Sequence, residues 1–167
     1  MAKVYTAIGI SICLCFLLAS LSSCEKRQEE TSGKLLDDNL LKNGSEFRKL
    51  LRSRDAGGRI PFAIQEIKRI SDSLFIAVLG GCSENAYRII WDGLIAESHP
   101  AQIRLLLVHD PAGDICDPSA EFLLRVDLNK IIGEAGDPED FIFHLANGSV
   151  KQDKSLYPDG TVATLEE

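Results

Sequence analysis

Beyond residue 60 the chain alternates apolar and polar residues in short runs, and a period of two is typical of β-strands. The clearest run covers residues 121–128, where Phe122, Leu124, Val126 and Leu128 fall on one face. Similar runs occupy residues 62–70, 74–79, 87–91, 103–108, 141–145 and 161–165. Polar turn signals separate several of them, at Ser71-Asp72-Ser73, Asp92-Gly93 and Asn147-Gly148. This pattern predicts an all-β fold, an antiparallel β-sandwich of the immunoglobulin-like kind.

Short helical segments are expected before residue 58, because the apolar residues there repeat at helical spacing. The first stretch is carried by four leucines: Leu35, Leu36, Leu40 and Leu41. The second covers residues 45–52, with Ser45 as the expected N-cap. Both are expected to dock on the sandwich, and binding to a partner is the alternative. A single helical turn is also expected within residues 127–132, at the crossover from one sheet to the other.

The first 23 residues have the three parts of a secretory signal peptide. Lys3 supplies a positive charge, residues 4–18 carry no charge, and small residues follow as far as Cys24. The apolar run is shorter than the roughly 20 residues that span a bilayer, and acidic residues follow it where a positive stop-transfer flank is expected. A cleaved signal is therefore predicted in preference to a permanent transmembrane helix.

Leu21-Ser22-Ser23-Cys24 resembles the lipobox of bacterial lipoproteins at all four positions. The resemblance implies a diacylglycerol on the sulfur of Cys24 and removal of residues 1–23; an ordinary signal with an incidental cysteine is the alternative. The rest of the chain is similar in its general sequence pattern to small envelope lipoproteins of diderm bacteria, in segments such as Trp91-Asp92-Gly93 and residues 143–148. Such a protein would be anchored to the outer membrane, on its periplasmic or its surface face. No activity follows from this likeness.

Three parts are therefore expected along the chain: a signal peptide over residues 1–23, a tether with short helical segments over 24–58, and the sandwich domain over 59–167. The 167 residues carry a net charge of −7. Removing residues 1–23 takes away one lysine and no acid, which leaves 17 basic against 25 acidic residues, or −8. Nucleic-acid binding needs a basic surface, so no nucleic-acid partner is expected. The charge also disfavours adsorption to anionic lipid, so the anchor alone would hold the protein at the membrane.

The five cysteines divide unequally over these parts. Two lie in the signal and one is Cys24, which leaves Cys82 and Cys116 as one pair in the mature domain. In an oxidising envelope such a pair is expected to form a disulfide. It would close a loop of about 34 residues, worth roughly 3 to 4 kcal/mol in the chain-entropy model. The alternative makes Cys82 a nucleophile or a redox thiol, although the chain has no CxxC motif to support it.

The loop that follows the run 103–108 is rich in oxygen ligands. Asp110, Asp114, Asp117 and Glu121 could surround a calcium ion, which accepts six to eight oxygens. Their spacing departs from that of an EF-hand, and Asp-Pro and Gly-Asp pairs also serve ordinary turns. A solvated turn is therefore preferred, and neither a metal nor any other cofactor is expected.

Two further patterns have a structural and a functional interpretation. Tyr87, Ile89 and Trp91 share one strand face and are expected in the core; a sugar-stacking platform is the alternative. His144 alternates with apolar neighbours and is expected on the solvent face of its strand.

The sequence thus favours a non-enzymatic binding or assembly module, anchored by lipid on Cys24 and presenting a sandwich to an envelope protein or a glycan. The alternative is an extracytoplasmic hydrolase or thiol enzyme that uses Cys82 or the loop of His109 and Asp110. No GxSxG, HExxH or phosphate-cradling glycine motif occurs to support a particular enzyme class.

Overall fold

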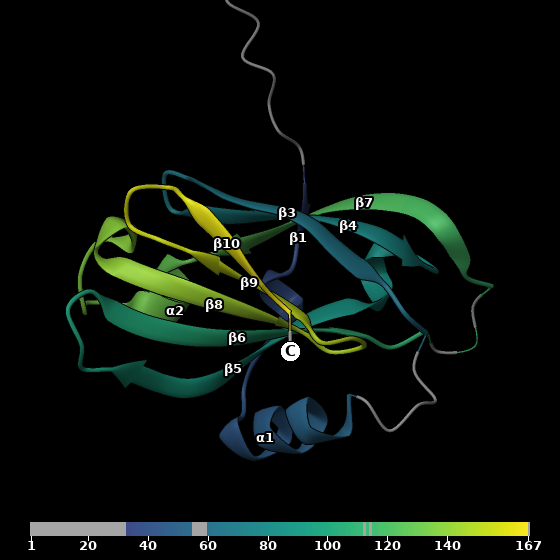
Figure 1. Ribbon diagram of the computed structural model, residues 1–167, viewed down its shortest axis with the longest axis horizontal. Helices are drawn as coiled ribbons and strands as arrows, with labels where there is room; N and C mark the ends of the chain where they lie inside the picture. Colours follow the sequence, from purple (N-terminus) through teal and green to yellow (C-terminus); the bar gives the residue numbers. More distant parts are fainter. Residues whose placement is uncertain (1–32, 55–59, 112, 114, 167) are drawn as a thin grey trace, which may run out of the picture. The chain divides into compact units, whose positions relative to one another are not determined.

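Two β-sheets form the framework of the protein in the computed structural model (Figure 1). The structure describes residues 33–54, 60–111, 113 and 115–166, all within one unit of the chain, Ser32–Glu167. The predicted signal, the lipobox with Cys24 and the expected boundary between residues 58 and 59 lie outside the described residues. Among the described residues, none of the helices is long and apolar enough to span a bilayer. The predicted all-β sandwich is confirmed.

The smaller sheet has four strands in the order β1-β7-β4-β3. These are β1 (Lys34–Leu35), β3 (Ala63–Ile70), β4 (Ser73–Gly81) and β7 (Asp117–Asp127). The hairpin of β3 and β4 turns at Ser71 and Asp72, as the polar turn signal predicts. Residues Phe122 to Val126 of β7 pair antiparallel with β4.

The larger sheet has six strands in the order β10-β9-β8-β6-β5-β2. These are β2 (Leu40–Lys42), β5 (Tyr87–Ala96), β6 (Ala101–His109), β8 (Phe141–Asn147), β9 (Gln152–Leu156) and β10 (Val162–Glu166). The expected antiparallel pairing holds for most neighbours, but β1–β7, β2–β5 and β6–β8 are parallel. The parallel pair β6–β8 arises because the chain leaves β6 for β7 in the other sheet. It then returns through the short helices α2 (Asn129–Ile132) and η3 (Pro138–Asp140).

The core lies between the sheets and takes the inward side chains of both. Tyr87, Ile89 and Trp91 all belong to it, with Tyr87 fully buried and Trp91 8% exposed. The core interpretation of this stripe is therefore confirmed, and the sugar-stacking alternative is wrong because both rings are packed in the core with too little exposed surface to stack on a sugar. Trp91 also lies beneath Lys42, whose Nζ is 4.7 Å from the ring centroid.

The helix predicted from the leucines at 35–41 does not form. The segment instead contains β1, the short helix η1 (Asp37–Asn39) and β2, with Leu36 fully buried. A stretch this short is marginal as an isolated helix, whereas pairing with β7 and β5 satisfies its backbone groups along two strands.

The turn predicted at Asp92-Gly93 is also absent, because β5 continues through it with an irregularity between Trp91 and Ile95. Gly93 adopts a φ of +86°, and Asp92 Oδ1 accepts a hydrogen bond from Leu94 N at 3.0 Å. A bulge and a hairpin turn both favour Gly at positive φ, so the residue pair alone does not distinguish them.

The second predicted helix forms as α1 (Gly44–Ser53) and packs on the outer face of the larger sheet. Its N-cap is Asn43, not Ser45, because the Asn43 side chain accepts a hydrogen bond from Glu46 N at 3.0 Å. Phe47 is 4% exposed and packs against outward side chains of β5, β6 and β8: Ile90, Leu106, Val108 and Ala146. Figure 1 shows α1 lying alone against this side of the sheet.

Candidate functional site

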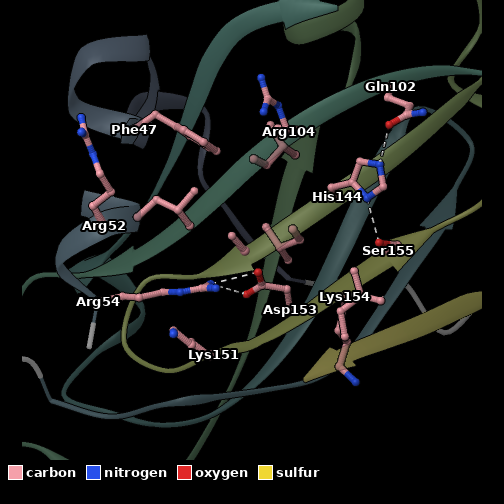
Figure 2. A pocket seen from close by; sticks show the side chains of 15 residues that line it. Phe47, Arg52, Arg54, Gln102, Arg104, His144, Lys151, Asp153, Lys154 and Ser155 are labelled. Atoms are coloured by element: carbon pink, nitrogen blue, oxygen red, sulfur yellow. Dashed lines mark hydrogen bonds and ion pairs between the residues drawn. The ribbon is translucent and has the colours of Figure 1, made fainter. Parts of the chain in front are cut away.

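A pocket of about 550 Å³ opens beside α1 on the outer face of the larger sheet (Figure 2). Its polar lining comes from the C-terminal end of α1, from β6 and β8, and from β9 with the residue before it: Arg52, Arg54, Gln102, Arg104, His144, Lys151, Asp153, Lys154 and Ser155. Phe47, Leu51, Ala146 and Leu165 are among the apolar residues of the lining.

The strand pattern explains why the pocket is polar. The outward residues of β6 change along the strand, from Gln102 and Arg104 to Leu106 and Val108. The apolar pair is covered by α1, whereas the polar pair lies beyond it. The side chain of His144 is on the same outer face, because His144 pairs with Arg104 on β6 and with Ser155 on β9.

The pocket has a charge opposite to that of the chain as a whole. Its lining contains five arginine or lysine side chains and one carboxylate, that of Asp153, in a protein with a net charge of −7. A cleft with one sign of charge raises the local concentration of ions of the opposite sign. The pocket is therefore suited to an anion.

Arg54 and Arg104 are held by carboxylates. Arg54 is 7% exposed, and its Nη1 donates to both oxygens of Asp153 at 2.7 and 2.9 Å. Asp153 Oδ1 also accepts from the backbone N–H of Asn147 at 3.0 Å. Arg104 Nη2 is 2.8 Å from Asp92 Oδ2, but the Arg104 side chain is 59% exposed while that of Asp92 is 3% exposed. Arg54 thus fixes the end of α1 to β9, and Arg104 remains accessible at the pocket.

The other cations lie at the rim. Arg52 is exposed, and its Nε donates to the backbone oxygen of Arg48 at 3.1 Å. Lys154 Nζ is turned toward β10, where it donates to Thr164 Oγ1 at 3.0 Å. Figure 2 shows Lys151 close to Arg54 and Asp153. Arg52, Lys151 and Arg104 therefore approach the pocket from three different parts of the chain.

His144 links three strands through side-chain hydrogen bonds (Figure 2). Its Nε2 is 3.1 Å from Gln102 Oε1, and its Nδ1 is 2.8 Å from Ser155 Oγ. Because the Gln102 oxygen can only accept, Nε2 carries the proton, and Nδ1 accepts from the Ser155 hydroxyl. Burial and the nearby positive charge of Arg104 lower the pKa of His144, so the ring is neutral at pH 7.

This chain of hydrogen bonds does not have the arrangement of a serine hydrolase. Ser155 is 1% exposed, and the group on the far side of the imidazole is a neutral amide instead of a carboxylate. A substrate would need to reach the hydroxyl, and burial prevents that. The network instead fixes the position of the Gln102 amide at the pocket.

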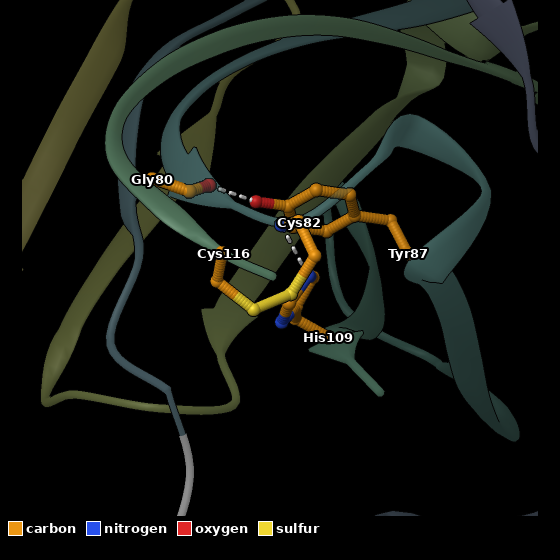
Figure 3. The surroundings of a disulfide bond; sticks show 5 residues. All are labelled: Gly80, Cys82, Tyr87, His109 and Cys116. Carbon is orange, nitrogen blue, oxygen red and sulfur yellow. Dashed lines mark hydrogen bonds between the residues drawn. A yellow bond between two sulfur atoms is a disulfide. The ribbon is translucent and has the colours of Figure 1, made fainter. Parts of the chain in front are cut away.

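The structure joins Cys82 and Cys116 in a disulfide, the pairing predicted from the sequence (Figure 3). The bond connects the residue after β4 to the residue before β7, two neighbouring strands of the smaller sheet. Beside it, His109 is 4% exposed and its Nε2 accepts from Cys82 N at 3.1 Å. Burial lowers the pKa of His109, which packs against the Tyr87 ring at a centroid distance of 4.7 Å.

His109 and Asp110 are neighbours in sequence but face different surroundings. The Asp110 side chain is 59% exposed, and its Oδ2 accepts from Arg88 Nε at 2.6 Å. Arg88 Nη1 also donates to Glu46 Oε1 on α1 at 2.8 Å. The pair that the enzyme alternative requires is therefore not assembled, because Asp110 contributes to an ion-pair cluster that ties α1 to β5.

The three described acidic residues of the calcium hypothesis, Asp110, Asp117 and Glu121, do not gather around one site. Asp110 forms an ion pair with Arg88, and Asp117 Oδ1 accepts hydrogen bonds from the backbone N–H and the hydroxyl of Ser119. Glu121 lies within β7, opposite Leu79 of β4. These hydrogen bonds from Ser119 lower the pKa of Asp117. Asp114 lies outside the described residues. Within the part of the chain that is described, no group of three or more His, Cys, Asp or Glu residues is placed to hold a metal ion.

The sequence interpretation missed the pocket, although one signal for it was present. His144 lies on the outer face of its strand as expected, but it is half-buried and hydrogen-bonded. Gln102 and Arg104 interrupt the outer face of a strand that is otherwise apolar on both faces. Polar residues at the beginning of an otherwise apolar strand face indicate where the element that covers this face ends.

No protein-family model matches the chain, and no curated protein matches it. Among solved structures, the crystal structure of a NigD-like immunity protein from Bacteroides caccae is similar with a TM-score of 0.44 and 16% sequence identity. The alignment covers 80% of this chain and 60% of that protein, so this chain spans less than two thirds of its length.

Proposed function

We propose that this protein is a non-enzymatic binding module of the bacterial cell envelope, held at the outer membrane by lipid on Cys24. The pocket beside α1 binds an anionic group carried by an envelope protein or a glycan. The observation that carries the proposal is the concentration of five cationic side chains around one carboxylate, on a chain whose net charge is −7.

The anchor is supported by the residues at the N-terminus. Leu21-Ser22-Ser23-Cys24 follows an uncharged apolar run and matches the lipobox pattern at each position. Two or three acyl chains, at about 0.8 kcal/mol for each buried methylene, hold a protein on a bilayer essentially permanently. An acidic mature chain gains little from anionic lipid headgroups, which is consistent with a covalent anchor.

Binding is favoured over catalysis by the surroundings of the candidate reactive groups. Cys82 is engaged in a disulfide, His109 is buried against Tyr87, and the hydroxyl of Ser155 is buried beneath the pocket. Each of these groups is accounted for by a structural contact. The accessible groups of the pocket are cations and amides, which bind oxyanions without reacting with them.

Metabolic labelling tests the anchor. Cells that express the full chain are grown with an alkyne analogue of palmitate, and the purified protein is examined for label and for its N-terminus. We expect label on the wild-type protein, loss of residues 1–23, and no label on Cys24→Ala. Label retained by Cys24→Ala, or an intact leader on cytosolic protein, would contradict the anchor.

Calorimetric titration tests the pocket. The full chain, solubilised with its lipid in a neutral detergent, is titrated with inorganic phosphate and with glucuronate. We expect at least one of the two to bind at a single site that weakens with added salt, and Arg52→Gln to weaken it further. Lys68→Gln, the same charge change on exposed β3, is the matched control. If neither anion binds, the pocket is not an anion site and the proposed function fails.

A further inference from the structure

The side chains of the pocket offer hydrogen-bond donors, while their acceptors are already engaged. Both oxygens of Asp153 accept from Arg54, and Oδ1 also accepts from Asn147 N. Gln102 Oε1 and His144 Nδ1 are occupied by the hydrogen bonds described above. Each of these acceptor atoms already accepts a hydrogen bond, so these side chains are poorly suited to accept one from a ligand hydroxyl.

The donors are those of Arg104, Arg52 and Gln102. A guanidinium has five N–H groups, and among the described residues Arg104 commits only Nη2, to Asp92. The Gln102 oxygen is hydrogen-bonded to His144, so the Gln102 side chain offers a ligand its two amide N–H groups. A ligand that matches this set has several acceptor oxygens, no donor at its charged end, and more than one negative charge.

We propose that the pocket is a phosphomonoester site. Arg104 binds the phosphate oxygens, and the Gln102 amide, on the same outward face of β6, donates to another. Arg52 lies across the pocket from Gln102 (Figure 2) and contributes its charge from the rim. His144 and Ser155 are positioning residues, because they hold the Gln102 amide and do not reach the ligand themselves. A phosphomonoester near pH 7 has three terminal acceptor oxygens and a charge between −1.5 and −2, whereas a carboxylate has two oxygens and a charge of −1.

This inference rests on the proposed function, since it names the anion that the same pocket takes. A sugar phosphate and a glycerophosphate headgroup share the chemistry. A cavity of about 550 Å³ has room for a phosphate together with its carrier, because ligand pockets of roughly 300 to 1,000 Å³ hold small organic molecules.

Titration with a series on one sugar ring tests the class of anion. The detergent-solubilised full chain is titrated with glucose, glucuronate, glucose 6-sulfate and glucose 6-phosphate at pH 7.5 and low salt. We expect glucose 6-phosphate to bind about tenfold more tightly than glucuronate and glucose 6-sulfate, and glucose not to bind. Inorganic phosphate and glycerol 3-phosphate are added as separate arms. Of glucose 6-phosphate and glycerol 3-phosphate, the one that binds more tightly identifies the carrier, and tighter binding of either than of glucuronate supports the proposal. If inorganic phosphate alone binds more tightly than glucuronate, the site takes the free ion and the phosphomonoester assignment is overturned.

Variants assign the roles. Removing the charge of Arg104 alone would leave Asp92 buried without its cation, so the pair is replaced together as Arg104→Gln with Asp92→Asn. This double variant should weaken glucose 6-phosphate about tenfold and reduce the salt dependence of binding. Arg52→Gln should weaken it about threefold, and Arg48→Gln, the same change one turn earlier on exposed α1, should leave it unchanged.

His144→Leu separates positioning from charge. It should weaken glucose 6-phosphate severalfold and leave the salt dependence as in the wild type, because the number of cations is unchanged. Glucuronate that binds as tightly as glucose 6-phosphate would overturn the phosphomonoester assignment and leave the proposed anion site standing. Absence of binding by every anion of the series would overturn both.

Discussion

Breaking the disulfide between Cys82 and Cys116 should destabilise the domain by a calculable amount. The two residues are 34 apart in sequence. In the chain-entropy model a loop of this length costs the unfolded chain about 12.6 cal/mol/K, which is about 3.8 kcal/mol at 25 °C. Typical domains have a free energy of unfolding of about 5 to 15 kcal/mol, so the variant should remain folded with a much smaller margin.

The perturbation is Cys82→Ser with Cys116→Ser, compared with the wild-type protein before and after reduction. Urea unfolding is followed by the fluorescence of Trp91, the one tryptophan of the chain, which is 8% exposed in the folded domain. With an m-value of about 2 kcal/mol/M, the unfolding midpoint should fall by roughly 2 M of urea. Reduced wild-type protein should match the double variant, and reductant should leave the variant unchanged.

The result that refutes this reasoning is a reduced protein whose midpoint lies within about 0.5 M of the oxidised one, because the cross-link would then contribute little through the unfolded chain. The calculation places the effect in the unfolded state, so the folded domain should keep its contacts. In particular, the hydrogen bond from Cys82 N to His109 involves the backbone and survives the substitution. A large change in the folded spectrum of the variant would show that the bridge also shapes the native structure.

Three further predictions concern the buried ion pair, the histidines and α1. Asp153→Ala removes the carboxylate that binds Arg54 and should lower the free energy of unfolding, measured by urea denaturation, by about 3 kcal/mol. This value is near the lower end for breaking a buried ion pair, because the Asp153 side chain is 24% exposed. Burial lowers the pKa values of His109 and His144, so both rings stay neutral in the folded domain while the unfolded chain takes up protons near pH 6.5. Their contribution to stability is therefore full above pH 7 and is lost as the pH falls toward 5. The free energy of unfolding should fall by at most about 1.4 kcal/mol per pH unit for each histidine. A urea midpoint that does not change between pH 7.5 and 5.5 would contradict this. Phe47→Ala should cost about 3 kcal/mol and speed hydrogen exchange in α1, whereas unchanged exchange would show that other contacts hold the helix.

Local patterns predicted the elements whose stabilising contacts are close in sequence. The hairpin of β3 and β4 is specified by alternation on both sides of a polar turn. The helical turn α2 follows Asp127, whose Oδ1 accepts from Asn129 N at 3.0 Å, and lies at the crossover between the sheets as expected. In each case the residues that determine the structure are close in sequence, at most 16 positions apart for the paired residues Ala63 and Leu79 of the hairpin.

Two of the errors occur where a distant partner decides the conformation. Leu35 and Leu41 belong to strands because β7 and β5 provide hydrogen-bond partners for their backbone groups. These partners are more than 45 residues away in the sequence. The parallel pairing of β6 with β8 depends on an excursion of the chain through the other sheet. Neither pairing is encoded in the period of the hydrophobic pattern, since both parallel and antiparallel strands alternate in the same way.

The pocket was missed because its lining comes from segments that are distant in the sequence, and its position follows from the width of the larger sheet. Six strands at about 4.8 Å spacing span roughly 24 Å, whereas a helix with its side chains is about 10 to 12 Å wide. α1 can therefore cover about two strands, and the apolar outward residues Leu106 and Val108 of β6 lie under it. Beyond that cover the outward positions include polar residues, such as His144 and Ser155. The pocket lies at this border, where the end of the helix brings Arg52 beside the polar strands. Among the described residues, α1 is the helix that packs on this face, so its edge creates a step in the surface, and five of the side chains along that step are cationic.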